Sequence, residues 1–219
     1  MKAHHIIFLL ILILAGCATP DAEPNAALHE LYAELDMEIA RSRDYEEGKE
    51  NRIADLRRQL ARTRDAARKT EIINGLITEF DAYNSDSALH YISLNLRRPE
   101  ILDIPGQHTR LTVKRADVLA HAGLFADALA TLDAIPRDSL TADILEQYYS
   151  TCCATYQYLS EYTNEHDTAL GHERRRALYV DSLRAVTDPA SFNHVVFVMI
   201  ERARNGDADT AATAVSYTH

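Results

Sequence analysis

The sequence predicts an all-α protein, a solenoid of stacked helical hairpins preceded by a charged helical or coiled-coil segment. Two observations favour this fold class. The chain contains no Trp and only 7 Gly and 6 Pro, and it is rich in Ala, Leu, Arg and Glu, which favour helix. In addition, an alanine that follows an aspartate by one or two residues returns at intervals of 40, 41 and 42 residues, at Ala88, Ala128, Ala169 and Ala211. A small residue at such a spacing lets the second helix of each hairpin cross the first closely.

The chain has 219 residues and a formal net charge of −10, and both values limit its function. The length suffices for one sizeable core or a short repeat array. An acidic chain argues against general nucleic-acid binding, which requires a basic surface, so we expect no nucleic-acid partner. Residues 52–69, with seven basic and two acidic side chains, depart from this balance. Either a solvated helix face or a basic patch for a partner fits them.

The first 16 residues have the pattern of a bacterial lipoprotein signal peptide. A basic start is followed by an apolar run over residues 6–14 and by small side chains before Cys17. The apolar run is shorter than the roughly 20 residues that span a bilayer, which argues against an uncleaved membrane helix. We assign signal-peptidase recognition to three residues, Leu14, Ala15 and Gly16. Lipidation is assigned to Cys17, where we expect a covalent diacylglyceryl group and no other cofactor.

A lipid at Cys17 predicts attachment to a membrane of the bacterial cell envelope, facing the periplasm or lying on the cell surface. The two other cysteines, Cys152 and Cys153, are adjacent. We interpret them as small residues packed within a helix, and a redox-sensing vicinal disulfide is the alternative.

Residues 17–26 contain two Pro and two acidic residues and predict a flexible tether. Residues 27–69 predict a highly charged helical segment. Its apolar positions form one face before residue 40 and another after residue 52, namely Leu28, Leu31, Leu35 and Ile39, then Ile53, Leu56 and Leu60. Between them the heptad positions fall on Ser42, Glu46 and Lys49, so two helices and one long helix with a weak middle fit equally well.

Residues 70–213 predict about four repeat units, the last of them incomplete. In the second unit Gly123 and Phe125 mark a turn between two apolar helical faces, and Pro136 ends the second face. This arrangement resembles the tetratricopeptide motif, and the interval is longer than the standard one of about 34 residues, which indicates a divergent repeat. The residues to which we assign repeat packing are Ala88, Ala128, Ala169, Ala211, Gly123 and Phe125.

Two stretches extend the resemblance. Residues 35–56, which include Arg43-Asp44-Tyr45, and residues 79–91, which include Phe80-Asp81-Ala82-Tyr83-Asn84, are similar to exported tetratricopeptide-repeat proteins of Bacteroidota. Those proteins carry a C-terminal domain of unknown function and are sometimes labelled as regulators. The resemblance implies sensing or scaffolding across the envelope, with a membrane helix and a cytoplasmic part after the repeats, and it supplies no catalytic residues.

The end of the chain predicts a fragment. Residues 214–219 resemble the translated end of a sequencing adapter, and the fourth unit is incomplete. A solenoid also requires a capping helix with a polar outer face. We therefore expect this sequence to be the N-terminal part of a longer protein.

Tyrosines are dense between residues 148 and 162. At helical spacing some of them pack inward, and the others can line a groove, because tyrosine combines a rigid ring with a hydroxyl. The candidate groove-lining residues are Tyr148, Tyr149, Tyr156 and Tyr158.

No motif of a nucleophile, a phosphate loop or a zinc protease occurs in the sequence, so we expect neither a catalytic site nor a metal. The predicted function is that of a membrane-anchored, non-catalytic helical-repeat lipoprotein that binds proteins or peptides. It would act as an envelope scaffold or as the sensor ectodomain of a regulatory protein. The alternative is a surface lipoprotein that captures glycans as nutrients.

Overall fold

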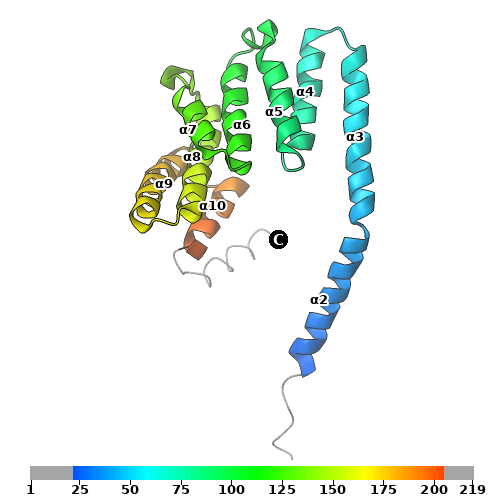
Figure 1. Ribbon diagram of the computed structural model, residues 1–219, viewed down its shortest axis with the longest axis vertical. Helices are drawn as coiled ribbons and strands as arrows, with labels where there is room; N and C mark the ends of the chain where they lie inside the picture. The colour runs from blue at the N-terminus through cyan, green and yellow to red at the C-terminus, as the bar shows by residue number, and fades with distance from the viewer. Residues whose placement is uncertain (1–21, 205–219) are drawn as a thin grey trace, which may run out of the picture. The chain divides into compact units, whose positions relative to one another are not determined.

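The computed structural model describes residues 22–204, and over that range it contains helices and no strands (Figure 1). The prediction of an all-α protein is therefore confirmed. The α-helices are α2 (Ala22–Ala40), α3 (Ser42–Arg62), α4 (Ala66–Phe80), α5 (Ser85–Leu96), α6 (Gln107–His121), α7 (Phe125–Asp133), α8 (Ala142–Tyr162), α9 (His166–Val186) and α10 (Phe192–Arg204). Two short 3-10 helices, η1 (Pro99–Ile101) and η2 (Arg137–Ser139), lie between hairpins. None of the helices in this range is both long and apolar enough to cross a bilayer.

The chain divides into two compact units at Arg52 and Ile53. In the first unit, α2 and the start of α3 are separate helices with a turn at Arg41. The Arg41 N–H still donates to the carbonyls of Met37, at 3.1 Å, and Glu38, at 3.2 Å. Of the two arrangements that the sequence allows, the structure contains two helices. The turn between them, at Arg41, lies just before the charged residues at which the apolar seam is interrupted.

The second unit begins with the last turns of α3 and the hairpin of α4 and α5. The α4 helix starts at its N-cap Asp65, whose carboxylate accepts the Arg68 N–H at 2.7 Å. Its apolar side packs with α5 in a core whose fully buried members include Ile53, Leu76 and Ile92. This hairpin is the first repeat unit.

The second hairpin joins α6 and α7 through a turn at Gly123. Gly123 has a φ of +79°, a backbone conformation that glycine adopts without steric cost. The following Leu124 N–H donates to the Leu119 carbonyl at 2.9 Å, which closes the end of α6. The predicted turn between two apolar faces therefore lies where the sequence pattern places it.

The third hairpin consists of α8 and α9, each of 21 residues. The α9 helix is capped by Glu165, whose carboxylate accepts the Asp167 N–H at 3.0 Å and the Thr168 N–H at 2.6 Å. After it, α10 provides the first helix of a fourth unit, and the rest of that unit lies outside the described residues. The repeat interval is longer than the standard one because 3-10 segments lie between the hairpins and because α8 and α9 are long.

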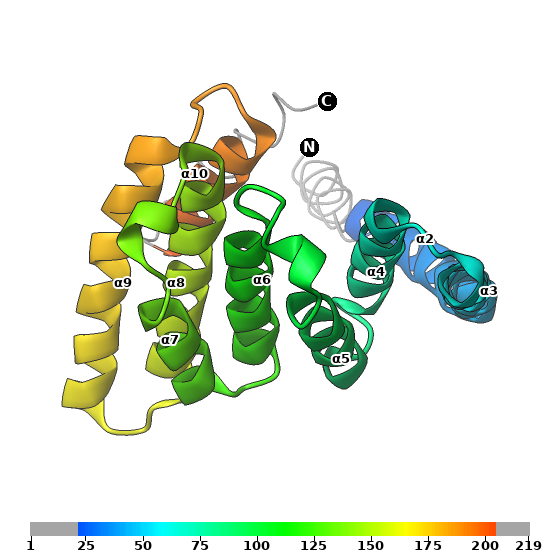
Figure 2. The same ribbon diagram turned by 90° about the horizontal axis from the view of Figure 1, so that it is seen from above.

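Seen from above, helices α4, α5, α6, α8 and α9 follow one another in chain order, and α7 is drawn in front of α8 (Figure 2). Consecutive helices pack together, and α6 also packs against α8. The α6 and α8 helices are the first helices of successive hairpins. Such a stack is the helical-hairpin solenoid that the sequence predicts.

Candidate functional site

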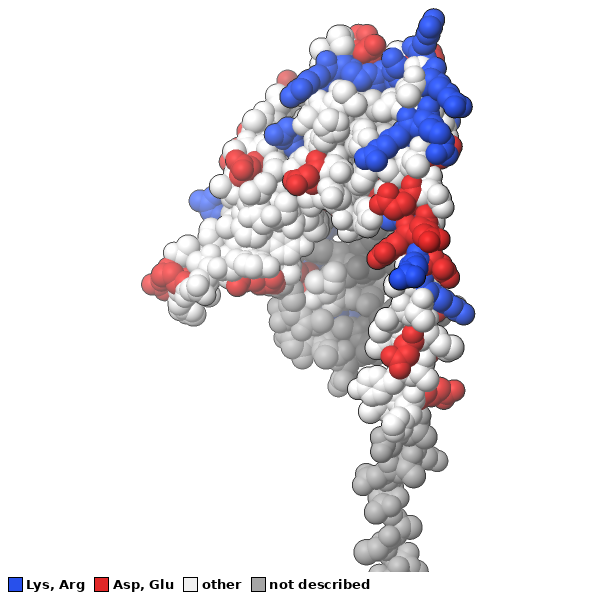
Figure 3. Space-filling view, turned by 45° about the vertical axis from the view of Figure 1, so that its right-hand side comes forward, with Lys and Arg blue, Asp and Glu red and all other residues white. Residues whose placement is uncertain are grey.

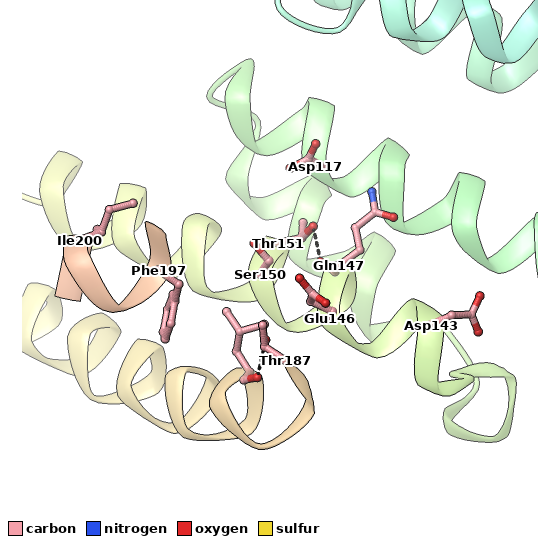
Figure 4. Close-up of a pocket in the computed structure, with 10 residues that line it drawn as sticks. Asp117, Asp143, Glu146, Gln147, Ser150, Thr151, Thr187, Phe197 and Ile200 are labelled. Atoms are coloured by element: carbon pink, nitrogen blue, oxygen red, sulfur yellow. Dashed lines mark hydrogen bonds between the residues drawn. The ribbon is translucent and has the colours of Figure 1, made fainter. Parts of the chain in front are cut away.

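A groove of about 570 Å³ opens between the second hairpin, the third hairpin and α10 (Figure 4). Four segments build it: α6, α8, the C-terminal end of α9 and α10. The lining residues are Asp117 from α6; Asp143, Glu146, Gln147, Ser150 and Thr151 from α8; Leu183 and Thr187 at the end of α9; and Phe197 and Ile200 from α10.

The α8 helix reaches the groove with one face and the core with another. Its groove residues recur three and four positions apart, from Asp143 through Gln147 to Thr151, which is the spacing of one helical face. The neighbouring stripe, with Ile144 and Tyr148, is buried in the core. This division follows from the α-helical period and makes α8 the main wall of the groove.

The groove has an acidic end. The Asp143 carboxylate accepts hydrogen bonds from the Thr141 hydroxyl, at 2.6 Å, and from the Arg110 guanidinium. These two bonds, in that order of importance, lower the pKa of Asp143, so this side chain is a carboxylate at neutral pH. This carboxylate is already paired with Arg110, and because its side chain is 57% exposed, a cationic or hydrogen-bond-donating group of a ligand can still reach it.

The second acidic group, Asp117, is held by Lys114. The Lys114 ammonium donates to Asp117 at 2.9 Å and to Asp81 of the α4–α5 turn at 2.5 Å. Partial burial would lower the pKa of Lys114, but these two hydrogen bonds outweigh burial and raise it. The charged side of the groove is therefore an ordered network that also ties α6 to the first hairpin.

The opposite side of the groove is apolar. Leu183 is buried, Phe197 is half-buried and Ile200 is 49% exposed. Between the two sides, the buried Thr151 and Thr187 side chains donate to the carbonyls of their own helices, at 2.9 and 2.8 Å, and they form part of the floor of the groove. A groove that is charged at one end and apolar at the other fits a peptide segment with both kinds of side chain.

The tyrosines predicted to line a groove divide into two sets. Tyr148 and Tyr156 are only 1% and 7% exposed, so the prediction is wrong for these two. They lie on the face of α8 that packs into the core, where Tyr156 stacks on Tyr179 with the ring centroids 5.7 Å apart. Tyr149 is half-buried and borders the same aromatic cluster. None of these three lines the groove described above.

Tyr158 lies in a second concavity, of about 430 Å³, at the turn of the second hairpin. Its ring stacks on Phe125 with centroids 6.0 Å apart, and the ring of Tyr162, which is 75% exposed, has its centroid 5.7 Å from that of Phe125. His121 meets Tyr158 edge-on at 5.7 Å. Tyr158 was among the predicted groove residues, whereas His121 and Tyr162 were not, because only the packing of α6 against α8 in the stack brings the ends of these two helices together.

The repeat-packing residues also divide. Ala88 and Ala128 are completely buried, and each lies in the first turns of the second helix of its hairpin. Ala169 is only half-buried, so the same packing role does not hold for it. The α9 helix instead meets α8 farther along, through Val180 and Leu183. Ala211 lies outside the described residues.

The proposed lipidation site also lies outside them, and so do the rest of the signal peptide and residues 214–219. These residues include the lipidation residue, Cys17, and the signal-peptidase recognition residues, Leu14, Ala15 and Gly16. Across residues 22–204, no group of three His, Cys, Asp or Glu side chains could hold a metal ion.

Cys152 and Cys153 are both buried and carry free thiols. Burial raises the pKa of each thiol from about 9 to about 12. Because the thiolate is the reactive form, both cysteines are unreactive in the folded protein at neutral pH. This agrees with the interpretation of two packed side chains rather than of a redox sensor.

Lys and Arg side chains gather on one part of the surface (Figure 3). The basic residues of α3 and of the start of α4 make contacts within the chain. Arg57 donates to the Tyr91 hydroxyl at 3.0 Å and lies over the Phe80 ring at 5.4 Å. Arg68 pairs with Glu71 at 2.8 Å. These contacts favour the interpretation of residues 52–69 as a solvated helix face, and we assign no partner to it.

The stacked hairpins, the glycine turn and the buried alanines define a helical-repeat protein of the tetratricopeptide class. Residues 39–218 match the family of the SusR N-terminal TPR domain, and the chain belongs to this family. No curated protein and no solved structure gives a significant match.

Proposed function

We propose that this chain is an envelope lipoprotein whose repeats bind a peptide segment of a partner protein in the groove between α6, α8 and α10. A diacylglyceryl group at Cys17 would anchor it to the membrane. It would serve as an envelope scaffold or as the sensor ectodomain of a regulatory protein, with no catalytic role. The observation that carries the peptide-binding proposal is the pairing of a fixed carboxylate, Asp143, with the apolar wall at Phe197 and Ile200 in one groove.

The chemistry of the groove suggests the kind of segment it would take. A Lys or Arg side chain of the ligand would lie beside Asp143, and an aliphatic or aromatic side chain would cover Ile200. Burying an apolar side chain contributes about 1.5–3 kcal/mol, whereas an exposed ion pair adds at most about 1 kcal/mol. Affinity should therefore depend mainly on the apolar end, and orientation on the acidic end.

Selection from a displayed library of random 12-residue peptides, followed by calorimetric titration of the selected peptide, would test the proposal. Ser150 is exposed in the middle of the groove, so Ser150→Trp should fill it and weaken binding at least about tenfold. Leu178→Trp is the matched control, because Leu178 is 68% exposed on α9 and lies outside the groove. Failure to select any peptide, or equal loss in both variants, would contradict the proposal.

Attachment to the membrane requires its own experiment. In a bacterium that processes lipoproteins, the unaltered chain should incorporate radiolabelled palmitate and sediment with membranes. Cys17→Ser should lose the label and appear in the soluble fraction. Label that persists in the variant would refute the assignment of Cys17.

The aromatic concavity favours a second candidate function, the capture of glycans. The rings of Tyr158, Tyr162 and Phe125, together with His121, line this concavity, and the two tyrosines add hydroxyls; sugar rings bind to such surfaces through their C–H groups and hydroxyls. Titration with a panel of neutral oligosaccharides would discriminate between the candidates. Binding that Tyr162→Ala abolishes and Ser150→Trp leaves unchanged would favour glycan capture over peptide binding.

A further inference from the structure

The α2 helix exposes a continuous apolar stripe. Leu28, Tyr32, Leu35 and Ile39 are 46%, 56%, 52% and 59% exposed, and Leu31 beside them is 61% exposed. At 100° per residue, all five fall within an arc of about 100°. Every residue from 28 to 47 is exposed in this unit of the chain. Soluble proteins seldom leave so many large apolar side chains together in water, so the stripe points to a partner.

The spacing of the stripe identifies the partner. Four of its members are separated by four, three and four residues, which is the alternation of core positions in a two-stranded coiled coil. The same register continues onto Ser42, Glu46 and Lys49, so the apolar seam ends with α2. Side chains at heptad spacing pack best, as knobs into holes, against another helix with the same spacing. We propose that α2 pairs in parallel with α2 of a second copy of this chain.

Charge argues against a membrane surface as the partner of the stripe. Residues 28–40 contain four acidic side chains, Glu30, Glu34, Asp36 and Glu38, and no Lys or Arg. Helices that lie on bilayers generally carry Lys and Arg on their polar face, because the headgroups are anionic. The α2 helix has the opposite charge, so an anionic bilayer would repel it.

Charge also favours the parallel orientation. Glu38 near the end of α2 and Arg43 in the first turn of α3 are five residues apart, the separation at which side chains of parallel partners face each other across a coiled coil, and this pairing requires the two chains to stay in register through the turn at Arg41. Each Glu38 would therefore meet Arg43 of the other copy, twice by symmetry. Glu38 already accepts from Arg41 at 2.9 Å and from Tyr45 at 3.1 Å, and a carboxylate has room for a further donor. An antiparallel pair with Tyr32 against Leu35 leaves Arg43 beyond the seam and lacks both ion pairs.

Sedimentation velocity of the full chain between about 1 and 100 µM would test the association. A seam of only two heptads should give a weak, reversible dimer. Leu35→Glu places a charge in the core of the pair and should raise the dissociation constant at least about 100-fold. Met37→Glu is the matched control, since Met37 is 56% exposed on the opposite side of α2. Circular dichroism should show the repeats equally folded in both variants.

Three results of this experiment would overturn the proposal. They are a monomer at 100 µM, an equal loss in Met37→Glu, and binding of the monomeric chain to anionic vesicles that Leu35→Glu abolishes. The orientation has a separate test by oxidation. Leu35→Cys should form a disulfide between copies under mild oxidation, above the level given by the unaltered chain, and Met37→Cys should not. A crosslink formed only when Leu35→Cys and Tyr32→Cys chains are mixed would show an antiparallel pair and refute the parallel arrangement.

Discussion

The second and third hairpins start their second helices with the same short motif but hold them in different ways. In the second hairpin, α7 has nine residues, follows the glycine turn directly and buries Ala128 completely. In the third hairpin, α9 has 21 residues and leaves Ala169 half-buried. Aromatic rings and a buried ion pair hold α9 in place. The comparison shows that the motif marks where a helix begins, whereas side chains farther along decide how closely it packs.

The ion pair is the strongest single difference between the two hairpins. The Arg176 side chain on α9 is 7% exposed and donates to Glu201 of α10 at 2.6 Å. It also donates to Glu173 at 2.8 Å and 2.6 Å, and the bonds to these two carboxylates raise the pKa of Arg176. Removing one partner of a buried pair leaves the other charge without compensation.

Arg176→Ala should therefore cost about 3–5 kcal/mol of the free energy of unfolding, measured by urea denaturation at pH 7. Arg184→Ala is the control, because Arg184 is 52% exposed and pairs only loosely with Asp181, at 3.9 Å. That variant should lose less than about 0.5 kcal/mol. Equal effects in the two variants would mean that α9 is not held by the ion pair.

Replacing Ala128 and Ala169 by a larger residue would compare how closely the two helices pack in the second and the third hairpin. Ala128→Leu adds three carbons at a fully buried position and should cost about 1–3 kcal/mol through overpacking. Ala169→Leu, at a half-buried position, should change stability by no more than about 0.5 kcal/mol. Equilibrium unfolding of both variants would measure this, and a larger cost at Ala169 would reverse our account of the third hairpin.

The glycines of the two hairpins should respond with opposite signs. Gly123 has φ +79° and an added Cβ would meet no atom within 4 Å, so Gly123→Ala should cost about 1 kcal/mol from backbone strain alone. Gly171 lies inside α9, and an added Cβ there also meets nothing within 4 Å. Gly171→Ala should therefore stabilise the protein by about 0.5–1 kcal/mol. Thermal denaturation would report both changes, and the same sign for both would contradict the assignment of strain to Gly123.

The two adjacent cysteines of α8 allow the local opening of the second and the third hairpin to be compared. Cys152 packs with the second hairpin, beside Leu132, and Cys153 packs against α9, beside Val180. In a Cys17→Ser background, single-thiol variants should be labelled at different rates at pH 8. The Cys153 thiol should react several-fold faster, because Cys153 is 8% exposed and Cys152 only 1%, so a smaller local opening uncovers it. Equal rates would indicate that both hairpins open together.

The same two thiols should make the free energy of unfolding decrease at high pH. Their pKa is raised from about 9 to about 12 in the folded protein. Between these values the unfolded chain loses protons that the folded chain keeps, so their contribution to the free energy of unfolding is complete below pH 9. It should fall as the pH rises from about 9 to 12. Urea titrations across that range would measure the decline, and it should be smaller when one thiol is replaced by alanine.

Much of the fold could be predicted because its signals are local. The turn at Gly123 and the apolar faces on either side of it are periodic features of consecutive residues, and they led to the correct second hairpin. The candidate site was predicted less well. Asp117, Asp143 and Ile200 come from three helices, and no spacing in the sequence relates them. Tyr148 and Tyr156 were placed in a groove because density of tyrosine does not reveal which side of a helix is covered.

The sequence by itself determined the all-α class, the helical hairpins, the family resemblance and the expected lipid anchor. These follow from helical period, turn residues and short motifs, which act over a few neighbouring positions. Only the tertiary structure decided which face of α8 enters the core, which alanine packs closely and where the groove opens. The α8 helix packs against α6, α7 and α9, so most of its surface is covered, and only the assembled stack leaves the stripe from Asp143 to Ser150 open to a ligand.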